Sequence, residues 1–263
     1  MSEYSTLLFE VRDNIAFITF NRPEAANSLN AEMARELMLA SIRCDEDPEV
    51  RVALLSGSGG TFSAGGDLKS FYAHRALLPA HLKEVTAYLH AAMSRFTRMD
   101  APLIAAVHGS AAGAGLSFVC ACDIVYAAES AKFTMAYTKI GLNPDGSSTY
   151  FLPRIVGLRR ALELTLTNRL LTATEALQLG IVTKVVPDSE LMAASTDMAK
   201  RLAAGPTRAF GASKRLLHSG FSETLETQME LESRSIAGLS KSEDGREGIK
   251  AFLEKRPAKF VGR

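Results

Sequence analysis

A buried strand that runs into a helix through a turn of small residues constrains this chain more than any other feature. Residues 103–107 (LIAAV) have the length and composition of a buried strand. Residues 109–115 contain only Gly, Ala and Ser, and Leu116, Val119 and Cys120 then follow at the spacing of one helix face. A turn with few side chains lets another molecule approach the backbone, and the first amides of the helix favour a phosphate or an oxyanion.

The turn lacks the patterns of the common nucleotide-binding and hydrolase loops. Gly113-Ala-Gly115 has no third glycine of a dinucleotide loop, and neither GxxxxGK[ST] nor GxSxG occurs in the chain. His108 and several glycines interrupt the apolar run, so the stretch does not predict a membrane span. Taken alone, the turn is compatible with simple packing as well as with anion binding.

Composition narrows the class of protein. The chain has 263 residues and a net charge of +1, which predicts no nucleic-acid partner and no membrane partner. Cys44, Cys120 and Cys122 are too few and wrongly spaced for a zinc site or a disulfide framework, so no metal is expected. The first residues, MSEYST, do not form a targeting signal. We therefore expect a soluble, cytoplasmic globular protein.

The order of the predicted elements indicates an α/β fold. Strands are predicted at 15–20, 52–56, 103–107 and 124–127. Asn30 can cap a helix running to about Cys44, and a mostly polar helical region lies between 68 and 99. Strands that alternate with helices favour crossover connections.

Helical patterns dominate beyond residue 147. One short strand, 183–186, is the only interruption that we expect there. We therefore predict a core over residues 1–200 and a helical region for packing or oligomerisation over residues 201–263.

Several segments in series resemble the signatures of the enoyl-CoA hydratase/isomerase (crotonase) family. The four main ones are 21–29 (NRPEAANSL), 62–68 (FSAGGDL), 104–115 (IAAVHGSAAGAG) and 122–124 (CDI). Further matches at 131–133, 170–176, 180–182, 246–248 and 252–256 extend the likeness over nearly the whole chain. One such motif alone would be weak, whereas all of them in this order identify the family.

The resemblance implies a crotonase-like spiral of ββα units with a helical C-terminal region that forms homotrimers, often paired into hexamers. It implies an acyl-CoA substrate, with no cofactor besides the coenzyme A thioester itself. It also implies an oxyanion hole made by the backbone amides of Gly66 and Ala114. The segments that line the family's CoA nucleotide pocket correspond here to Ala25, Ala26, Ser28, Ala64, Gly65, Asp67 and Leu68.

The acid–base residues distinguish the reactions of this family. Classical hydratases carry two glutamates, and the corresponding positions here are Ser117 and Tyr137. Without that pair, simple hydration lacks an evident acid and base. The segment around Asp145 instead resembles the phenylacetate-pathway isomerase branch, whose acid–base group is an aspartate at this position. One carboxylate suffices to move a double bond, although Pro-Asp-Gly is also an ordinary turn.

His90 leaves other reactions open. Asp145 and His90 both match positions used by the 4-chlorobenzoyl-CoA dehalogenase branch, where the aspartate attacks the ring and the histidine activates water. That branch has tryptophan at the position of Tyr137, and this chain contains no tryptophan. Enoyl-CoA isomerase is the predicted activity, and hydration, dehalogenation and acyl-CoA binding without catalysis remain the alternatives.

Overall fold

Six strands form the larger of two sheets in this computed structural model, which describes residues 4–263. Their order across the sheet is β1-β2-β3-β4-β6-β9, in which β1 is antiparallel to β2 and every other neighbouring pair is parallel. The strands span Leu7–Arg12 (β1), Ile15–Phe20 (β2), Val52–Gly57 (β3), Leu103–Val107 (β4), Ile124–Ala128 (β6) and Lys184–Val186 (β9). The strands predicted from apolar runs are confirmed, and parallel pairing explains the long connections between them.

Three short strands form a second sheet, which is built by the same path of the chain. They are β5 (Ser110–Ala112), β7 (Lys132–Thr134) and β8 (Leu171–Thr172), with β5 parallel and β8 antiparallel to β7. The order β4, β5, α4 is one ββα unit, and β6 and β7 begin the next. From β4 to β7, the chain thus alternates between the two sheets and winds as a spiral.

The second sheet corrects two predictions. The segment 109–115, predicted as a turn, contains β5, and β8 is a strand beyond residue 147 that was not expected. These strands depend on partners distant in sequence: the Ala112 amide donates to the Ser63 carbonyl at 2.9 Å, and the Gly113 amide donates to the Thr134 carbonyl at 3.1 Å. Strands of two or three residues show no alternating pattern from which they could be predicted.

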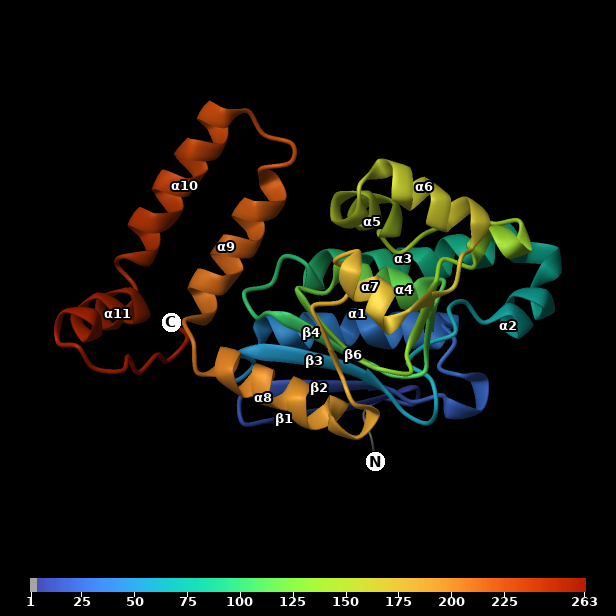
Figure 1. Ribbon diagram of the computed structural model, residues 1–263, viewed down its shortest axis with the longest axis horizontal. Coiled ribbons are helices and arrows are strands. Elements are labelled where there is room, and N and C mark those ends of the chain that lie inside the picture. The colour runs from blue at the N-terminus through green and yellow to red at the C-terminus, as the bar shows by residue number, and fades with distance from the viewer. Residues whose placement is uncertain (1–3) are drawn as a thin grey trace.

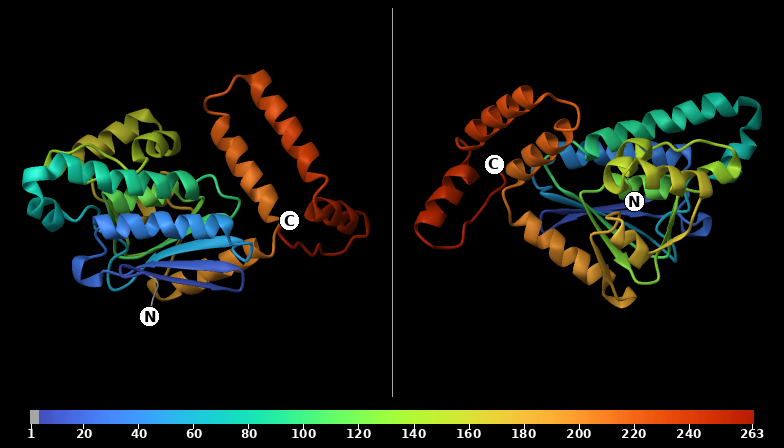
Figure 2. Two further views of the ribbon diagram at one scale, coloured as in Figure 1. Left: turned by 180° about the vertical axis from the view of Figure 1, so that it is seen from behind. Right: turned by 45° about the horizontal axis from the view of Figure 1, so that its top comes forward.

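Helices cover both faces of the larger sheet. Figures 1 and 2 show α1 and α3 on one side of it and α8 on the other. Asn30 caps α1, because its side chain accepts a hydrogen bond from the Met33 amide at 2.9 Å. The helices of this region are α1 (Ala31–Glu46), α2 (Leu68–Ala73), α3 (Leu78–Phe96), α4 (Ala114–Ala121), α5 (Ser148–Val156), α6 (Leu158–Thr167), α7 (Ala173–Gln178) and α8 (Leu191–Ala203). Within residues 4–263, no helix combines the length and apolar character needed to cross a membrane.

The last three helices form an arm that projects away from this core (Figures 1 and 2). They are α9 (Thr207–Ser219), α10 (Leu225–Leu239) and α11 (Glu243–Leu253). Large apolar side chains such as Ile236 and Phe252 are exposed on the arm. The boundary predicted at residue 200 falls inside α8, which packs against β3 and β4, and a role of the arm in trimer formation stays a prediction.

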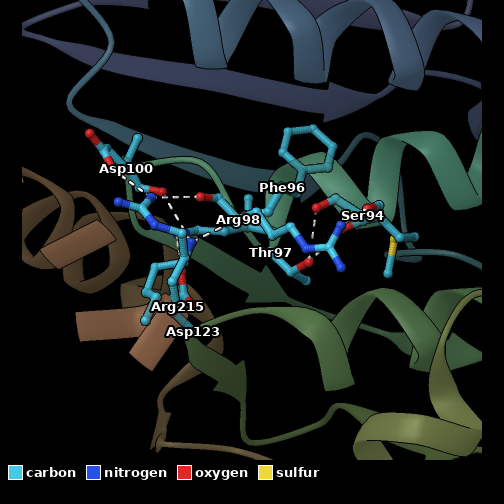
Figure 3. A network of polar contacts seen from close by, with 11 residues as sticks. Ser94, Phe96, Thr97, Arg98, Asp100, Asp123 and Arg215 are labelled. Carbon is cyan, nitrogen blue, oxygen red and sulfur yellow. Dashed lines mark hydrogen bonds and ion pairs between the residues drawn. The ribbon is translucent and has the colours of Figure 1, made fainter. Parts of the chain in front are cut away.

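A buried lysine attaches the arm to the core. Lys214 of α9 forms an ion pair with Asp123 at 2.8 Å and donates to the carbonyls of Phe96 and Ala101 at 3.1 and 3.3 Å. Arg215, the next residue, pairs with Asp100 at 2.7 Å on the exposed side of the same junction. Figure 3 shows Asp100, Asp123 and Arg215 gathered where α9 meets the end of α3.

We expect Lys214→Met to destabilise the protein by about 1 to 3 kcal/mol, because the buried ammonium group donates hydrogen bonds that methionine cannot make. Asp123 would keep the Leu103 amide as a donor at 2.7 Å, whereas the carbonyl groups of Phe96 and Ala101 would lose the lysine, and the apolar stem is retained. Urea unfolding measures the change. Arg215→Met is the matched control, and loss of its exposed pair should change the free energy of unfolding by less than about 1 kcal/mol. Equal effects of the two substitutions would contradict this assignment.

Candidate active site

Two glycine turns from different ββα units lie against each other at the centre of the fold. Gly65 has φ +97° and Gly113 has φ +52°, backbone conformations that residues other than glycine rarely adopt. A Cβ atom at Gly65 would lie 2.8 Å from the carbonyl oxygen of Ala112 and 3.3 Å from the Cα of Gly113. The absence of both side chains therefore allows the backbones to touch, which brings Gly66 and Ala114 together.

The amides of Gly66 and Ala114 are both without a hydrogen-bond partner among the residues that the structure describes. The Leu29 amide donates to the Gly65 carbonyl at 2.7 Å and the Asp67 amide donates to the Leu29 carbonyl at 2.9 Å, so the amide of Gly66 points away from that segment. Ala114 is the first residue of α4, where the amide has no partner within the helix. Two such donors can stabilise a negatively charged oxygen.

Both residues line a mostly apolar cavity of about 390 Å³. Its apolar wall consists of Leu29, Leu68, Phe71, Leu82, Val85, Ile140 and Leu142. Asp145 supplies the one carboxylate among the described residues that line the cavity, and Tyr137 lies beside it. The structure thus brings together three of the four predicted catalytic residues: Gly66, Ala114 and Asp145.

The two positions that correspond to the hydratase glutamates contact each other and contact Asp145. Tyr137, in a short 3₁₀ helix (η3, Tyr137–Ile140), donates from Oη to Oδ1 of Asp145 at 2.5 Å. Ser117 Oγ lies 3.0 Å from Tyr137 Oη and 2.9 Å from the backbone oxygen of Asp145. Burial raises the pKa of Tyr137, and the negative charge of Asp145 raises it further, so the phenol keeps its proton.

His90 lies outside the cavity. It lines a separate groove of about 880 Å³ that shares Thr86, Asn143 and Asp145 with the cavity. The Gly146 amide donates to Nε2 of His90 at 3.3 Å, which occupies the lone pair that would act as a base. Its imidazole makes no hydrogen bond or ion pair with the Asp145 carboxylate. The structure therefore places His90 beside the Asp145 turn but not among the groups that face the two amides.

The residues predicted for the CoA nucleotide pocket belong to two adjoining segments. The Ala64 amide donates to the Ala26 carbonyl at 3.0 Å, which joins the two segments. Ala64 is exposed, Leu68 is half-exposed, and both line the cavity. Of the remaining predicted residues, Ala25 and Ala26 are half-buried, and Ser28, Gly65 and Asp67 are buried.

The Asp67 carboxylate is already engaged within the protein. It caps α2 by accepting from the Ser70 amide at 3.0 Å and pairs with Arg22 at 2.8 Å. Burial acts to raise the pKa of Asp67, but the hydrogen bonds from Ser70 and Arg22 outweigh it and hold this pKa below its ordinary value. The carboxylate therefore has a structural role, and any contact of Asp67 with a ligand would be made by its backbone atoms.

Sequence reasoning missed two lysines that line the cavity. Lys83 of α3 and Lys139 of η3 are both exposed. The sequence does not distinguish these two lysines from others, because an exposed lysine on a helix is common. The fold alone brings them to the cavity that contains the two free amides, where their charges could attract the phosphates of an anionic ligand.

Comparison with known proteins decides the family. The family described as enoyl-CoA hydratase/isomerase matches residues 10–263. The chain belongs to the enoyl-CoA hydratase/isomerase family. It is 42% identical over 260 residues to a Rhodobacter capsulatus protein named "Probable enoyl-CoA hydratase", with 99% of each chain covered. It is 37% identical to the 1,2-epoxyphenylacetyl-CoA isomerase of Escherichia coli, with 98% of each chain covered.

Solved structures confirm the predicted crotonase-like α/β fold of this enoyl-CoA hydratase/isomerase family member. An enoyl-CoA hydratase from Polaromonas sp. JS666 superposes with a TM-score of 0.93 at 32% sequence identity, covering 97% of this chain and all of that chain. The chain is therefore an enzyme of this family, and an acyl-CoA substrate fits it. The names of the relatives include both a hydratase and an isomerase, so the reaction must be argued from the site itself.

Proposed function

We propose that this enzyme is an enoyl-CoA double-bond isomerase, in which the amides of Gly66 and Ala114 bind the thioester oxygen and Asp145 transfers the proton. The observation that carries the proposal is the composition of the cavity: two free amides share it with a single carboxylate. Ser117 and Tyr137 stand where a hydratase has its two glutamates, so water addition lacks its acid–base pair.

Each step can be assigned to a group that lines the cavity. With a 3-enoyl-CoA bound, Asp145 takes a proton from the α-carbon, and the electron pair of that bond moves toward the thioester oxygen. The amides of Gly66 and Ala114 stabilise the resulting dienolate. Asp145 then returns the same proton to the γ-carbon, which leaves the double bond between the α- and β-carbons. No water or cofactor is consumed, in keeping with one carboxylate and an apolar wall.

The proposed position of the CoA follows from the amides. The thioester carbon lies at Gly66 and Ala114, so the nucleotide would lie along the segments that contain Ala26 and Ala64, and the acyl chain would enter the apolar cavity. Lys83 and Lys139, which line that cavity, could pair with the CoA phosphates.

A three-substrate assay tests the proposal. The purified enzyme should convert a 3-enoyl-CoA into the 2-enoyl-CoA, detected by the absorbance of the conjugated thioester. Water addition to a 2-enoyl-CoA and multiple-turnover hydrolysis of 4-chlorobenzoyl-CoA to the 4-hydroxy product should each be at least about 100-fold slower, because neither reaction has its second catalytic group in the cavity. Dominant hydration or multiple-turnover hydrolysis would overturn the proposal in favour of that activity. Thioester binding with no turnover of any substrate would indicate a non-catalytic binder.

A further inference from the structure

Tyr137 and Ser117, at the positions of the hydratase glutamates, both form hydrogen bonds with Asp145. Tyr137 Oη lies 2.5 Å from Oδ1 of the carboxylate, within hydrogen-bond distance, and Oδ2 has no hydrogen-bond partner among the described residues. A carboxylate has no proton to give, so the phenol must be the donor in this contact. The two oxygens of Asp145 are therefore unequal, and one alone is free to exchange a proton.

We propose that Tyr137, supported by Ser117, is a positioning residue that holds Oδ1 of Asp145, so that Oδ2 alone carries the proton in the isomerisation. The proposal rests on the proposed function, because it concerns the same carboxylate. Tyr137 keeps its proton throughout the cycle: Oδ2 takes the α-proton and releases it to the γ-carbon while the bond from Oη to Oδ1 persists.

Ser117 contributes by its small size as well as by its hydroxyl. It is 1% exposed, and its Oγ lies within 3.0 Å of both Tyr137 Oη and the backbone oxygen of Asp145. A Cβ atom on Gly146 would lie 3.0 Å from the Cβ of Ser117, so the turn that carries Asp145 packs directly on this serine. A larger side chain at this position, glutamate included, would displace the turn and with it the carboxylate.

Tyr137 is uncharged, so its hydrogen bond fixes the carboxylate without adding a competing charge. Among residues 4–263, no charged group makes a hydrogen bond or ion pair with this carboxylate. The charged and titratable side chains that share the cavity or the groove with Asp145, besides Tyr137, are Lys83, His90, Arg98, Lys139, Tyr150, Arg215 and His218.

Tyr137→Phe in the full-length enzyme tests the proposal. A hydrogen bond to a charged group contributes about 10-fold to 100-fold in an equilibrium or a rate, so kcat should fall by about that factor with KM changed less than about 3-fold. Ser117→Ala should lower kcat as well, and by less.

Tyr126→Phe is the matched control, since it removes the hydroxyl of another buried tyrosine that lies on β6 and lines neither the cavity nor the groove. It should leave kcat unchanged. If the unsubstituted enzyme isomerises a 3-enoyl-CoA and Tyr137→Phe matches it in kcat, the positioning role is wrong and the proposed function stands. A loss of stability in Tyr137→Phe with KM changed as much as kcat would also overturn the role.

A second measurement decides the proposal even if no isomerase activity is found. The enzyme is labelled with ¹³C at the aspartate carboxyl carbons, and the Asp145 signal is assigned by its absence in Asp145→Asn. At one neutral pH, the chemical shift of this signal should differ between Tyr137→Phe and the unsubstituted protein, because the carboxylate loses its hydrogen-bond donor. Identical chemical shifts would overturn the assignment of Tyr137, whatever reaction the enzyme catalyses.

Discussion

Asp145→Asn should convert a 3-enoyl-CoA at about one-thousandth of the unsubstituted rate, within the roughly 10²- to 10⁴-fold range that a positioned acid–base group contributes. The substitution is nearly isosteric, and the amide oxygen can still accept the hydrogen bond from Tyr137 Oη. The amide cannot take a proton from carbon, so the chemical step is lost while the turn keeps its shape. The measurement is kcat at saturating substrate, with circular dichroism and thermal unfolding to verify the fold.

His90→Ala is the matched control for this loss. His90 lines the neighbouring groove and contacts the Gly146 amide, so its removal disturbs the same turn without touching the carboxylate. We expect kcat to fall by less than about 10-fold, in line with the loss of one hydrogen bond. If Asp145→Asn retained more than a tenth of the activity, or if His90→Ala were the more damaged variant, the proton carrier would have to be sought elsewhere.

The elements that the sequence predicted are those whose pattern is local. β4 consists of five buried residues in a continuous apolar run, and α1 begins at the Asn30 cap. These features are set by composition, periodicity and capping within a few residues of one another. In contrast, β5 and β8 are strands because distant segments pair with them, and no window of the sequence contains both partners.

The same division applies to the site. The small-residue turns indicated where a backbone could meet a ligand, but the contact between Gly65 and Gly113 arises from the spiral of the fold. Tyr137 and Asp145 are eight residues apart in a segment without periodicity, so their direct hydrogen bond could not be predicted from their spacing. The sequence did show that both glutamates were missing; the structure adds that Tyr137 donates to the Asp145 carboxylate and that Ser117 donates to the backbone oxygen of Asp145.

This arrangement gives a physical reason why one carboxylate accompanies a serine and a tyrosine. Two carboxylates in close contact disfavour each other's ionisation. This suits a reaction in which one group acts as the acid and the other as the base, because the two groups must then differ in protonation. A double-bond shift needs one group that both accepts and donates the same proton. A neutral phenol beside Asp145 adds a donor without adding a competing charge.

Ala114→Pro should lower kcat by about 100-fold to 1000-fold, the loss expected when one of two oxyanion donors is removed. Ala114 is the first residue of α4, a position at which proline is well tolerated because its missing amide hydrogen has no partner within the helix. The substitution therefore removes the proposed donor and leaves the helix intact. The Cδ atom of the proline ring takes the place of the amide hydrogen. Ala114→Ser, which keeps the amide hydrogen and adds one oxygen to the side chain, is the control and should lose less than about 10-fold. Equal activity of the two variants, with unfolding temperatures alike, would show that the thioester oxygen does not depend on this amide.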